Sequence, residues 1–445
     1  MKILINILLL VFTITVLAVF GVYADKMKKR TVYFCLASII LLGFILRLST
    51  VFLIPCVPVS DYNTMFSAGV SVAEGGKPFT LGSYFQRFPH MTTFSALCGF
   101  LMKVFGKDVI TIKIFSVLFK TVAIFAAALI GKELKGRKGM LSSAFLYSVF
   151  LPDIFYTPVV ASENFALTFI MFAVYFYIKA YKCENNNKSS ILMLYCGIIL
   201  SAGCLLRGVA PFYLAAFSGG IILCFKTFKK KFLSIVALFA SFLLIFNFAS
   251  LVLYHSGTSE YKLSDKGEPY IVYILVGSNF ETNGMYSSED HGVYLDAGED
   301  PQKASEIAKE KLIERLKSNP DKILPLLINK TKIIWSDASF NSVYWSMVEN
   351  GEEADNPFYP VAQSMCKTMY NLLLILSVLF LVLYNKRPIS FMLLLLPLAF
   401  EGGLMLMEIQ PRYTFSVAYI FAVFAAIGSC VIIEKFTERF GEADV

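Results

Sequence analysis

The sequence is dominated by long apolar runs that are separated by short connections. We count about eleven such runs, and a helix needs about 20 mostly apolar residues to cross a bilayer. Hydrophobic residues make up 57% of the 445-residue chain and charged residues only 16%, whereas a soluble domain has about 25% charged residues. The chain is therefore predicted to be an all-α polytopic membrane protein. Its runs are residues 3–24, 31–55, 108–131, 140–158, 160–179, 190–206, 208–225, 232–254, 368–385, 388–406 and 413–433.

Lysine and arginine residues gather in every second connection between the runs. Because such clusters are retained on the cytoplasmic side of a membrane, one orientation places all of them inside. The net charge of +8 then reflects membrane orientation, and no nucleic-acid partner is expected. The same orientation predicts a multi-pass protein of the plasma membrane with a cytoplasmic C-terminus. The clusters lie at residues 26–30, 132–138, 179–188, 226–231 and 386–387.

The remaining long connections are predicted to be external, and they divide the chain into three parts. Residues 1–254 form an N-terminal transmembrane module whose first external loop spans residues 56–107. Residues 255–367 form an external loop or small domain, and residues 368–445 form the C-terminal helices with a short tail.

Both external segments contain patterns of short helices. In the first loop, apolar residues recur near helical spacing from Asp61 to Glu74 and a short apolar stretch covers 90–105. These patterns predict two helices that lie in the membrane interface. In the second segment, Pro301 opens an amphipathic helix that Asn319-Pro320 ends.

Three carboxylates are placed at the outer ends of predicted spans. Asp61 is a candidate general base, and Glu163 and Asp153 are candidates of the same kind, because carboxylates near lipid are costly and often functional. Each has a simpler interpretation. Asp61 could cap the interfacial helix, and Glu163 could serve only as a helix N-terminal charge.

Three arginines map to the same predicted face. Arg87, Arg207 and Arg412 come from distant parts of the chain, and their paired donors suit phosphate oxygens. The alternative for each one is contact with lipid headgroups by snorkelling. Arg47 and Lys120 instead fall inside spans, where each needs a partner; Lys120 with Asp153 is one conceivable pair.

Cofactor and metal signals are weak. The three histidines, His90, His255 and His291, are far apart in the sequence and do not suggest a metal site. A divalent ion held by carboxylates is conceivable but not indicated. We find neither a Walker loop nor a GxSxG motif, which argues against an ATP-driven pump and a serine hydrolase.

Several short motifs together resemble GT-C glycosyltransferases of the protein O-mannosyltransferase-like branch (family 39). The resemblance implies a sugar donor on a polyprenyl phosphate and transfer on the external face, with no cofactor required. Asp61 resembles the catalytic acid of the first loop, and Glu163 resembles an acidic position at the start of a later span. The motifs are Asp61, Tyr84-Phe85-Gln86-Arg87-Phe88-Pro89-His90, Ser162-Glu163, Leu206-Arg207-Gly208 and Glu408-Ile409-Gln410-Pro411-Arg412-Tyr413.

The cationic positions extend the resemblance. Arg87 and Arg207 resemble positions that face the donor phosphate in the related lipid A aminoarabinose transferases. Arg412, with His90 and Glu408 as further candidates, belongs to the same set of motifs. The resulting hypothesis is inverting transfer to an envelope acceptor, a glycan, lipid or protein hydroxyl, with Asp61 as the base.

Two other functions remain open at this stage. A lipid-linked sugar flippase or other transporter would explain charges inside spans, such as Arg47 and Lys120. An envelope polymerase or ligase would use a lipid-diphosphate donor instead. The crowding of candidate residues on one predicted face favours the transferase.

Overall fold

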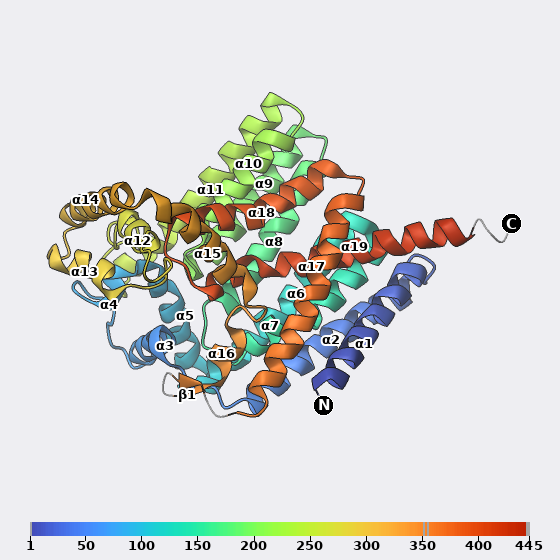
Figure 1. Ribbon diagram of the computed structural model, residues 1–445, viewed down its shortest axis with the longest axis horizontal. Helices are drawn as coiled ribbons and strands as arrows, with labels where there is room; N and C mark the ends of the chain where they lie inside the picture. Colours follow the sequence, from blue (N-terminus) through green and yellow to red (C-terminus); the bar gives the residue numbers. More distant parts are fainter. Residues whose placement is uncertain (1, 350–351, 354–355, 442–445) are drawn as a thin grey trace.

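The computed structural model describes residues 2–349, 352–353 and 356–441, and these residues are almost entirely helical (Figure 1). Within them, nine helices are long and apolar enough to cross a membrane, judged by length and composition alone. The prediction of an all-α polytopic membrane protein is confirmed. The nine are α1 (Lys2–Tyr23), α2 (Lys29–Leu53), α6 (Val109–Ser148), α8 (Glu163–Lys182), α9 (Asn186–Leu206), α11 (Phe228–His255), α17 (Tyr359–Leu383), α18 (Arg387–Leu406) and α19 (Phe415–Gly441).

Two features explain why these nine helices correspond to about eleven predicted apolar runs. Helix α6 folds back on itself at Lys135 and Gly136, where Gly136 has φ +62°, a conformation that favours glycine. Its limbs meet at Gly131 and Gly139, where a Cβ atom on either glycine would collide with the carbonyl group of the other. One helix thus covers the run 108–131 and the start of 140–158, and α7 (Leu151–Tyr156) continues the latter. The short helix α10 (Ala210–Cys224) corresponds to the run 208–225.

The helix that corresponds to the run 368–385 begins several residues earlier than that run. Helix α17 begins at Tyr359 rather than near residue 368, so it includes the last part of the segment predicted to be external. Its first turns carry polar side chains, which hid them from a search for apolar runs. One of these, Ser364, accepts a hydrogen bond from Asn6 of α1 at 2.8 Å, and this contact shows how a polar turn can pack against a neighbouring span.

The lysine and arginine clusters meet at one end of the bundle, which we call the basic end. Lys138 from the bend of α6 pairs with Asp25 after α1 and with Glu434 of α19. Lys182, at the end of α8, pairs with Glu133 of α6 at 2.6 Å. These contacts tie together connections that are far apart in the sequence.

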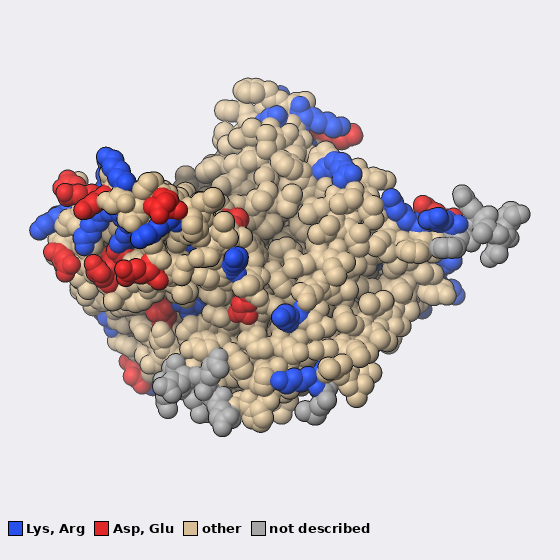
Figure 2. All heavy atoms as spheres, in the orientation of Figure 1, with Lys and Arg blue, Asp and Glu red and all other residues tan. Residues whose placement is uncertain are grey.

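The opposite end, which we call the loop end, carries the short elements of the two long connections and of the connection between α18 and α19 (Figure 1). Its surface holds many acidic and basic side chains over α12–α14, whereas the bundle surface beside it is largely uncharged (Figure 2). These elements are α3 (Ser60–Ala73), α4 (Tyr84–Arg87), η1 (Pro89–Met91), α5 (Thr92–Phe105), α12 (Tyr270–Gly277), α13 (Ser288–Asp296), α14 (Pro301–Ser318), η2 (Pro320–Lys322), α15 (Ile323–Ser336), α16 (Ser342–Met347), the antiparallel pair β1 (Val348–Glu349) and β2 (Glu352–Glu353), and η3 (Pro411–Tyr413).

Local sequence explains where several of these helices begin and end. Helix α3 ends before Gly75, which has φ +87°, and it packs against α5. Each of these two helices has 14 residues, too few to cross a bilayer. Helix α14 begins at Pro301, as the sequence pattern predicted, and the Asp300 side chain caps it by accepting from two backbone N–H groups.

Candidate active site

A cavity of about 900 Å³ lies at the loop end of the bundle. Its walls come from the first loop, the end of α9, the segment before α12, α13, and the connection between α18 and α19. Segments separated by hundreds of residues therefore line one space. Its polar and aromatic lining includes Asp61, Tyr84, Arg87, His90, Arg207, Glu268, His291, Trp345, Glu408, Arg412 and Tyr413.

Asp61 stands in the first turn of α3 and faces this cavity with a side chain that is 31% exposed. One carboxylate oxygen pairs with Arg412 Nη2 at 3.1 Å, and the other accepts a hydrogen bond from the Tyr84 hydroxyl at 2.8 Å. The residue at the N-cap position of α3 is Val59, which makes no side-chain capping bond. The carboxylate is therefore held by side chains of the site instead of capping its own helix.

Arg412 lies in the turn that precedes α19 and is buried. Its Nη1 donates to the Tyr62 hydroxyl at 2.9 Å, and its guanidinium stacks over the Trp345 ring at 5.1 Å. Its buried Nε has no hydrogen-bond partner among the described residues. Arg412 is thus fixed in orientation, and one of its buried donors is unsatisfied among the described residues.

Glu163 begins α8 and pairs with Arg207, which ends α9, at 3.2 Å. The Glu163 side chain is only 1% exposed and also accepts from the Tyr156 and Ser162 hydroxyls. Arg207 lines the cavity, and Glu163 lies behind it. Of the two leading candidate acids, Asp61 is therefore the one that a substrate can reach.

Arg87 belongs to an ion network on another wall of the cavity. Its Nη2 donates to Glu268 Oε1 and to the carbonyl oxygen of His291, each at 2.8 Å. His291 bridges two carboxylates, with Nδ1 3.1 Å from Glu268 and Nε2 2.8 Å from Glu408. Burial lowers the pKa of His291, but its hydrogen bonds to the two glutamates outweigh burial and raise the pKa to about 9. The imidazole is therefore protonated at neutral pH and shares its charge between both glutamates.

His90 also lines the cavity, with its ring against Gly208. Burial and the nearby Arg207 cation lower the pKa of His90 to about 4. The two histidines of the site are consequently in opposite states at neutral pH, since His90 is neutral and His291 is charged.

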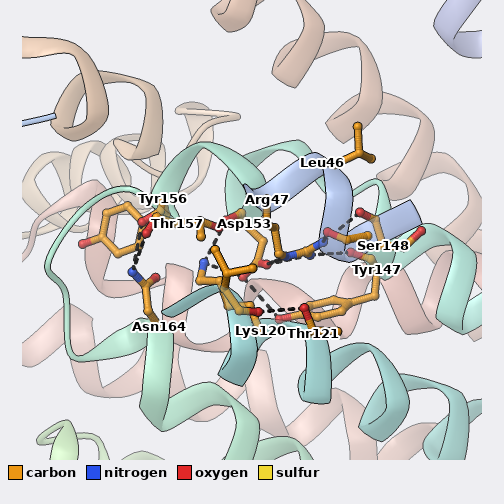
Figure 3. A network of polar contacts seen from close by, with 12 residues as sticks. Leu46, Arg47, Lys120, Thr121, Tyr147, Ser148, Asp153, Tyr156, Thr157 and Asn164 are labelled. Atoms are coloured by element: carbon orange, nitrogen blue, oxygen red, sulfur yellow. Dashed lines mark hydrogen bonds and ion pairs between the residues drawn. The ribbon is translucent and has the colours of Figure 1, made fainter. Parts of the chain in front are cut away.

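Asp153 lies apart from the cavity, in a buried cluster with two cations (Figure 3). It pairs with Arg47 at 2.7 Å and with Lys120 at 2.9 Å, and all three side chains are at most 1% exposed. Arg47 also donates to the carbonyl groups of Tyr147 and Ser148 at the end of α6. Asp153 therefore pairs with both cations that were predicted to lie inside spans, Arg47 and Lys120.

The structure adds site residues that sequence analysis missed. Glu268 and His291 were part of a segment with no recognisable motif, and they meet Arg87 and Glu408 only in the folded chain. Aromatic residues form much of the remaining wall, and they do not stand out in a chain with 42 Phe and 23 Tyr. They include Tyr62 and Trp345. Among the described residues, no three His, Cys, Asp or Glu side chains form a group able to hold a metal ion.

Comparison with known proteins identifies the fold. The structure matches an oligosaccharyltransferase from Archaeoglobus fulgidus tethered to an acceptor peptide, with a TM-score of 0.54 and 16% identity over 93% of this chain and 51% of that one. It matches the same organism's oligosaccharyltransferase AglB in complex with an inhibitory peptide and a dolichol-phosphate, with a TM-score of 0.54 and 14% identity over 94% and 52%. This chain thus spans about half the length of the matched chains. No protein-family model and no curated protein sequence matches it. At this level of identity the comparison shows a shared fold with these membrane-protein structures.

Proposed function

We propose that this protein is a membrane glycosyltransferase that moves a sugar from a polyprenyl-phosphate donor to a hydroxyl group of a cell-envelope acceptor. The acceptor is a glycan, a lipid or a protein. The observation that carries the proposal is the meeting of Asp61 with Arg87, Arg207 and Arg412 on the walls of one cavity. The order of the sequence motifs further suggests the O-mannosyltransferase-like branch, family 39.

The cavity is assigned to the external side of the plasma membrane. It lies at the loop end, opposite the basic end, where lysines of the positive clusters pair with Glu434 and Glu133. Positive clusters are retained in the cytoplasm, so the basic end and the C-terminus face inward. A lipid-borne donor would supply an activated sugar there without any nucleotide.

Asp61 is the proposed general base. Its carboxylate takes the proton of the acceptor hydroxyl while that oxygen attacks the anomeric carbon, and the bond from that carbon to the phosphate oxygen breaks on the opposite face. The anomeric centre is inverted, and the phosphate leaves with the bonding electrons. Arg412 and Tyr84 fix the direction of the carboxylate. A general base typically contributes about 10²–10⁴ in rate.

The arginines are proposed to bind the donor phosphate. Arg412 Nε and Arg87 Nε are both buried without a hydrogen-bond partner among the described residues, and each unsatisfied buried donor costs about 1–3 kcal/mol. The guanidinium groups that line the cavity would bind phosphate oxygens, which gain charge as the sugar departs. Arg207 lines the same cavity with one nitrogen engaged by Glu163. Stabilisation of the leaving phosphate by arginine can replace a general acid.

An apolar wall suits the lipid part of such a donor. Phe212, Phe246, Phe400 and Leu404 line the cavity on the side of α10, α11 and α18. A polyprenyl chain would pack against this wall while its phosphate reaches the arginines, which supports a lipid-borne donor over a soluble one.

The transporter interpretation loses its main support in the structure. It explained Arg47 and Lys120 as residues lining a path through the membrane. Both side chains instead pair with Asp153 and are at most 1% exposed. The charged residues that line the cavity gather at one end of the bundle, as an enzyme with a single-sided site requires.

A transfer assay tests the proposal. Purified protein is incubated with a radiolabelled polyprenyl-phosphate sugar and envelope acceptors. We expect transfer by the native chain and a loss of about 10²–10⁴ in Asp61→Asn, with undecaprenyl phosphate binding retained. Asp321→Asn, an exposed carboxylate in η2, serves as the matched control and should transfer normally.

Each alternative has its own outcome in this assay. Normal turnover by Asp61→Asn would remove Asp61 from the mechanism. Donor binding without transfer or hydrolysis would indicate a transporter. Activity only with a lipid-diphosphate donor would indicate a polymerase or ligase.

A further inference from the structure

A continuous chain of hydrogen bonds connects the two arginines that flank Asp61 and Glu163. Arg412 Nη1 donates to the Tyr62 hydroxyl at 2.9 Å. The Tyr62 and Tyr156 hydroxyls are hydrogen-bonded, and Tyr156 donates to Glu163 Oε1 at 3.3 Å. Glu163 Oε1 also lies 3.2 Å from Arg207 Nη2. The chain thus begins at the guanidinium that holds Asp61 and ends at the carboxylate that holds Arg207.

The direction of this chain follows from the donor inventory. A tyrosine hydroxyl has a single hydrogen. Because Tyr156 gives its hydrogen to Glu163, Tyr62 gives its own to Tyr156 and accepts from Arg412. All bonds therefore point the same way, from a cation to a carboxylate, and bonds aligned in this manner strengthen one another in a buried site.

Tyr156, in the middle of this hydrogen-bond chain, is the last residue of α7, a helix of six residues. Asp153, near the start of α7, pairs with Arg47 of α2 and Lys120 of α6. At the other end of α7, Asn164 of α8 donates to the carbonyl oxygen of Tyr156 at 3.1 Å (Figure 3). It also donates to the carbonyl oxygen of Val159 at 2.7 Å. This short helix is thus fixed from both sides, and the position of the Tyr156 hydroxyl is fixed with it.

We propose that Tyr62, Tyr156 and Glu163 are positioning residues that hold Arg412 and Arg207 in register with each other for the donor phosphate, and that Asp153 fixes the helix on which Tyr156 stands. The inference rests on the proposed function for its role in turnover. Glu163 lies behind Arg207 and is almost fully buried, so it acts through the arginines and not on the substrate. Two cations from distant segments would otherwise repel each other and adjust independently.

A mutant cycle tests the chain without an activity assay. Asp61→Asn alters one end and Glu163→Gln the other, and the hydrogen-bond chain described above joins the two side chains. Independent sites have additive effects on stability. We expect the shifts in melting midpoint to be non-additive in the native background and clearly closer to additive in a Tyr156→Phe background. Additive shifts in the native background, or non-additivity of equal size in both backgrounds, would overturn the proposal.

A buried tyrosine outside the chain provides the matched control. Tyr384 is 3% exposed, and its hydroxyl donates to the carbonyl oxygen of Leu134 at the basic end. Tyr384→Phe therefore removes one buried hydroxyl bond of the same kind. In this background the non-additivity between Asp61→Asn and Glu163→Gln should persist.

Transfer kinetics separate this inference from the proposed function. Tyr156→Phe should lower kcat/KM by about 10- to 100-fold, the size expected for losing a hydrogen bond within a charged network, while Tyr384→Phe stays near the native value. If the native chain transfers sugar and the two variants behave alike, positioning by Tyr156 is overturned and the proposed function stands. If the native chain does not transfer sugar, the proposed function fails, and the melting cycle alone decides whether the chain couples the two ends.

Discussion

The bridge that His291 forms between Glu268 and Glu408 should make the stability of the protein depend on pH in the alkaline range. The perturbation is a rise in pH, compared between the native chain and His291→Gln. Glutamine keeps a polar side chain but cannot carry the proton that both glutamates share. Because the bridge joins α13 to the segment after α18, its loss should loosen the loop end.

The sign and size follow from the pKa. The folded-state pKa is about 9, against 6.5 for an unperturbed histidine. A raised pKa means that the folded state binds the proton more tightly. The contribution is therefore complete below about pH 6.5 and is lost as the pH rises through 9. A shift of this size corresponds to about 3 kcal/mol of unfolding free energy, and the His291 side chain is only 6% exposed, so solvent screens it little.

Melting midpoints in detergent, recorded from about pH 6 to about pH 10, would measure this contribution. We expect the native chain to be more stable than His291→Gln at the acid end of this range, and the gap to close as the pH passes 9. A gap that stays constant across the range would refute the assignment of a shared proton to His291. The control is His255→Gln, because His255 is exposed. The melting midpoint of this variant should depend on pH in the same way as that of the native chain.

Three further substitutions test the buried parts of the fold and the support of Asp61. Asp153→Ala leaves the buried cations Arg47 and Lys120 without their carboxylate and should lower the unfolding free energy by about 3–5 kcal/mol. Lys120→Met leaves a neutral Arg47–Asp153 pair and should lower it less, so equal losses in melting experiments would contradict this account. Gly131→Val should abolish the yield of monodisperse protein, because even a Cβ there collides with Gly139, while Gly402→Val, which meets open space, should be tolerated; normal yield of Gly131→Val would show that the α6 limbs are not in backbone contact. Tyr84→Phe removes one of the two side chains that hold Asp61 and should lower the transfer rate by about tenfold, the effect of one hydrogen bond to a charged group; a rate equal to that of the native chain would show that Arg412 alone orients the carboxylate.

Apolar run length was sufficient to predict the class of the fold, because a bilayer imposes a nearly fixed length on each crossing. It failed where polar residues extend a helix, as at the start of α17, where Ser364 binds Asn6 of α1. It separated the two limbs of α6 correctly, because the structure has two helical limbs joined by a kink at Lys135 and Gly136.

The candidate site was predicted in part. Residue type and placement at the ends of runs were enough to select Asp61 and the three arginines, all of which line the cavity. They were not enough to rank the acids. Glu163 and Asp153 look alike in the sequence, but one supports Arg207 and the other neutralises Arg47 and Lys120. Such roles depend on which side chains meet across the bundle, which run patterns do not encode.

The most direct test of the central claim is an experimental structure of the protein with bound undecaprenyl phosphate. Our account predicts that the phosphate lies within hydrogen-bond distance of Arg207 and Arg412, with the lipid chain against Phe246 and Phe400 and the Asp61 carboxylate facing the anomeric position. A phosphate bound at the basic end of the bundle, or a lipid-filled cavity in which these arginines keep only their present carboxylate partners, would contradict it.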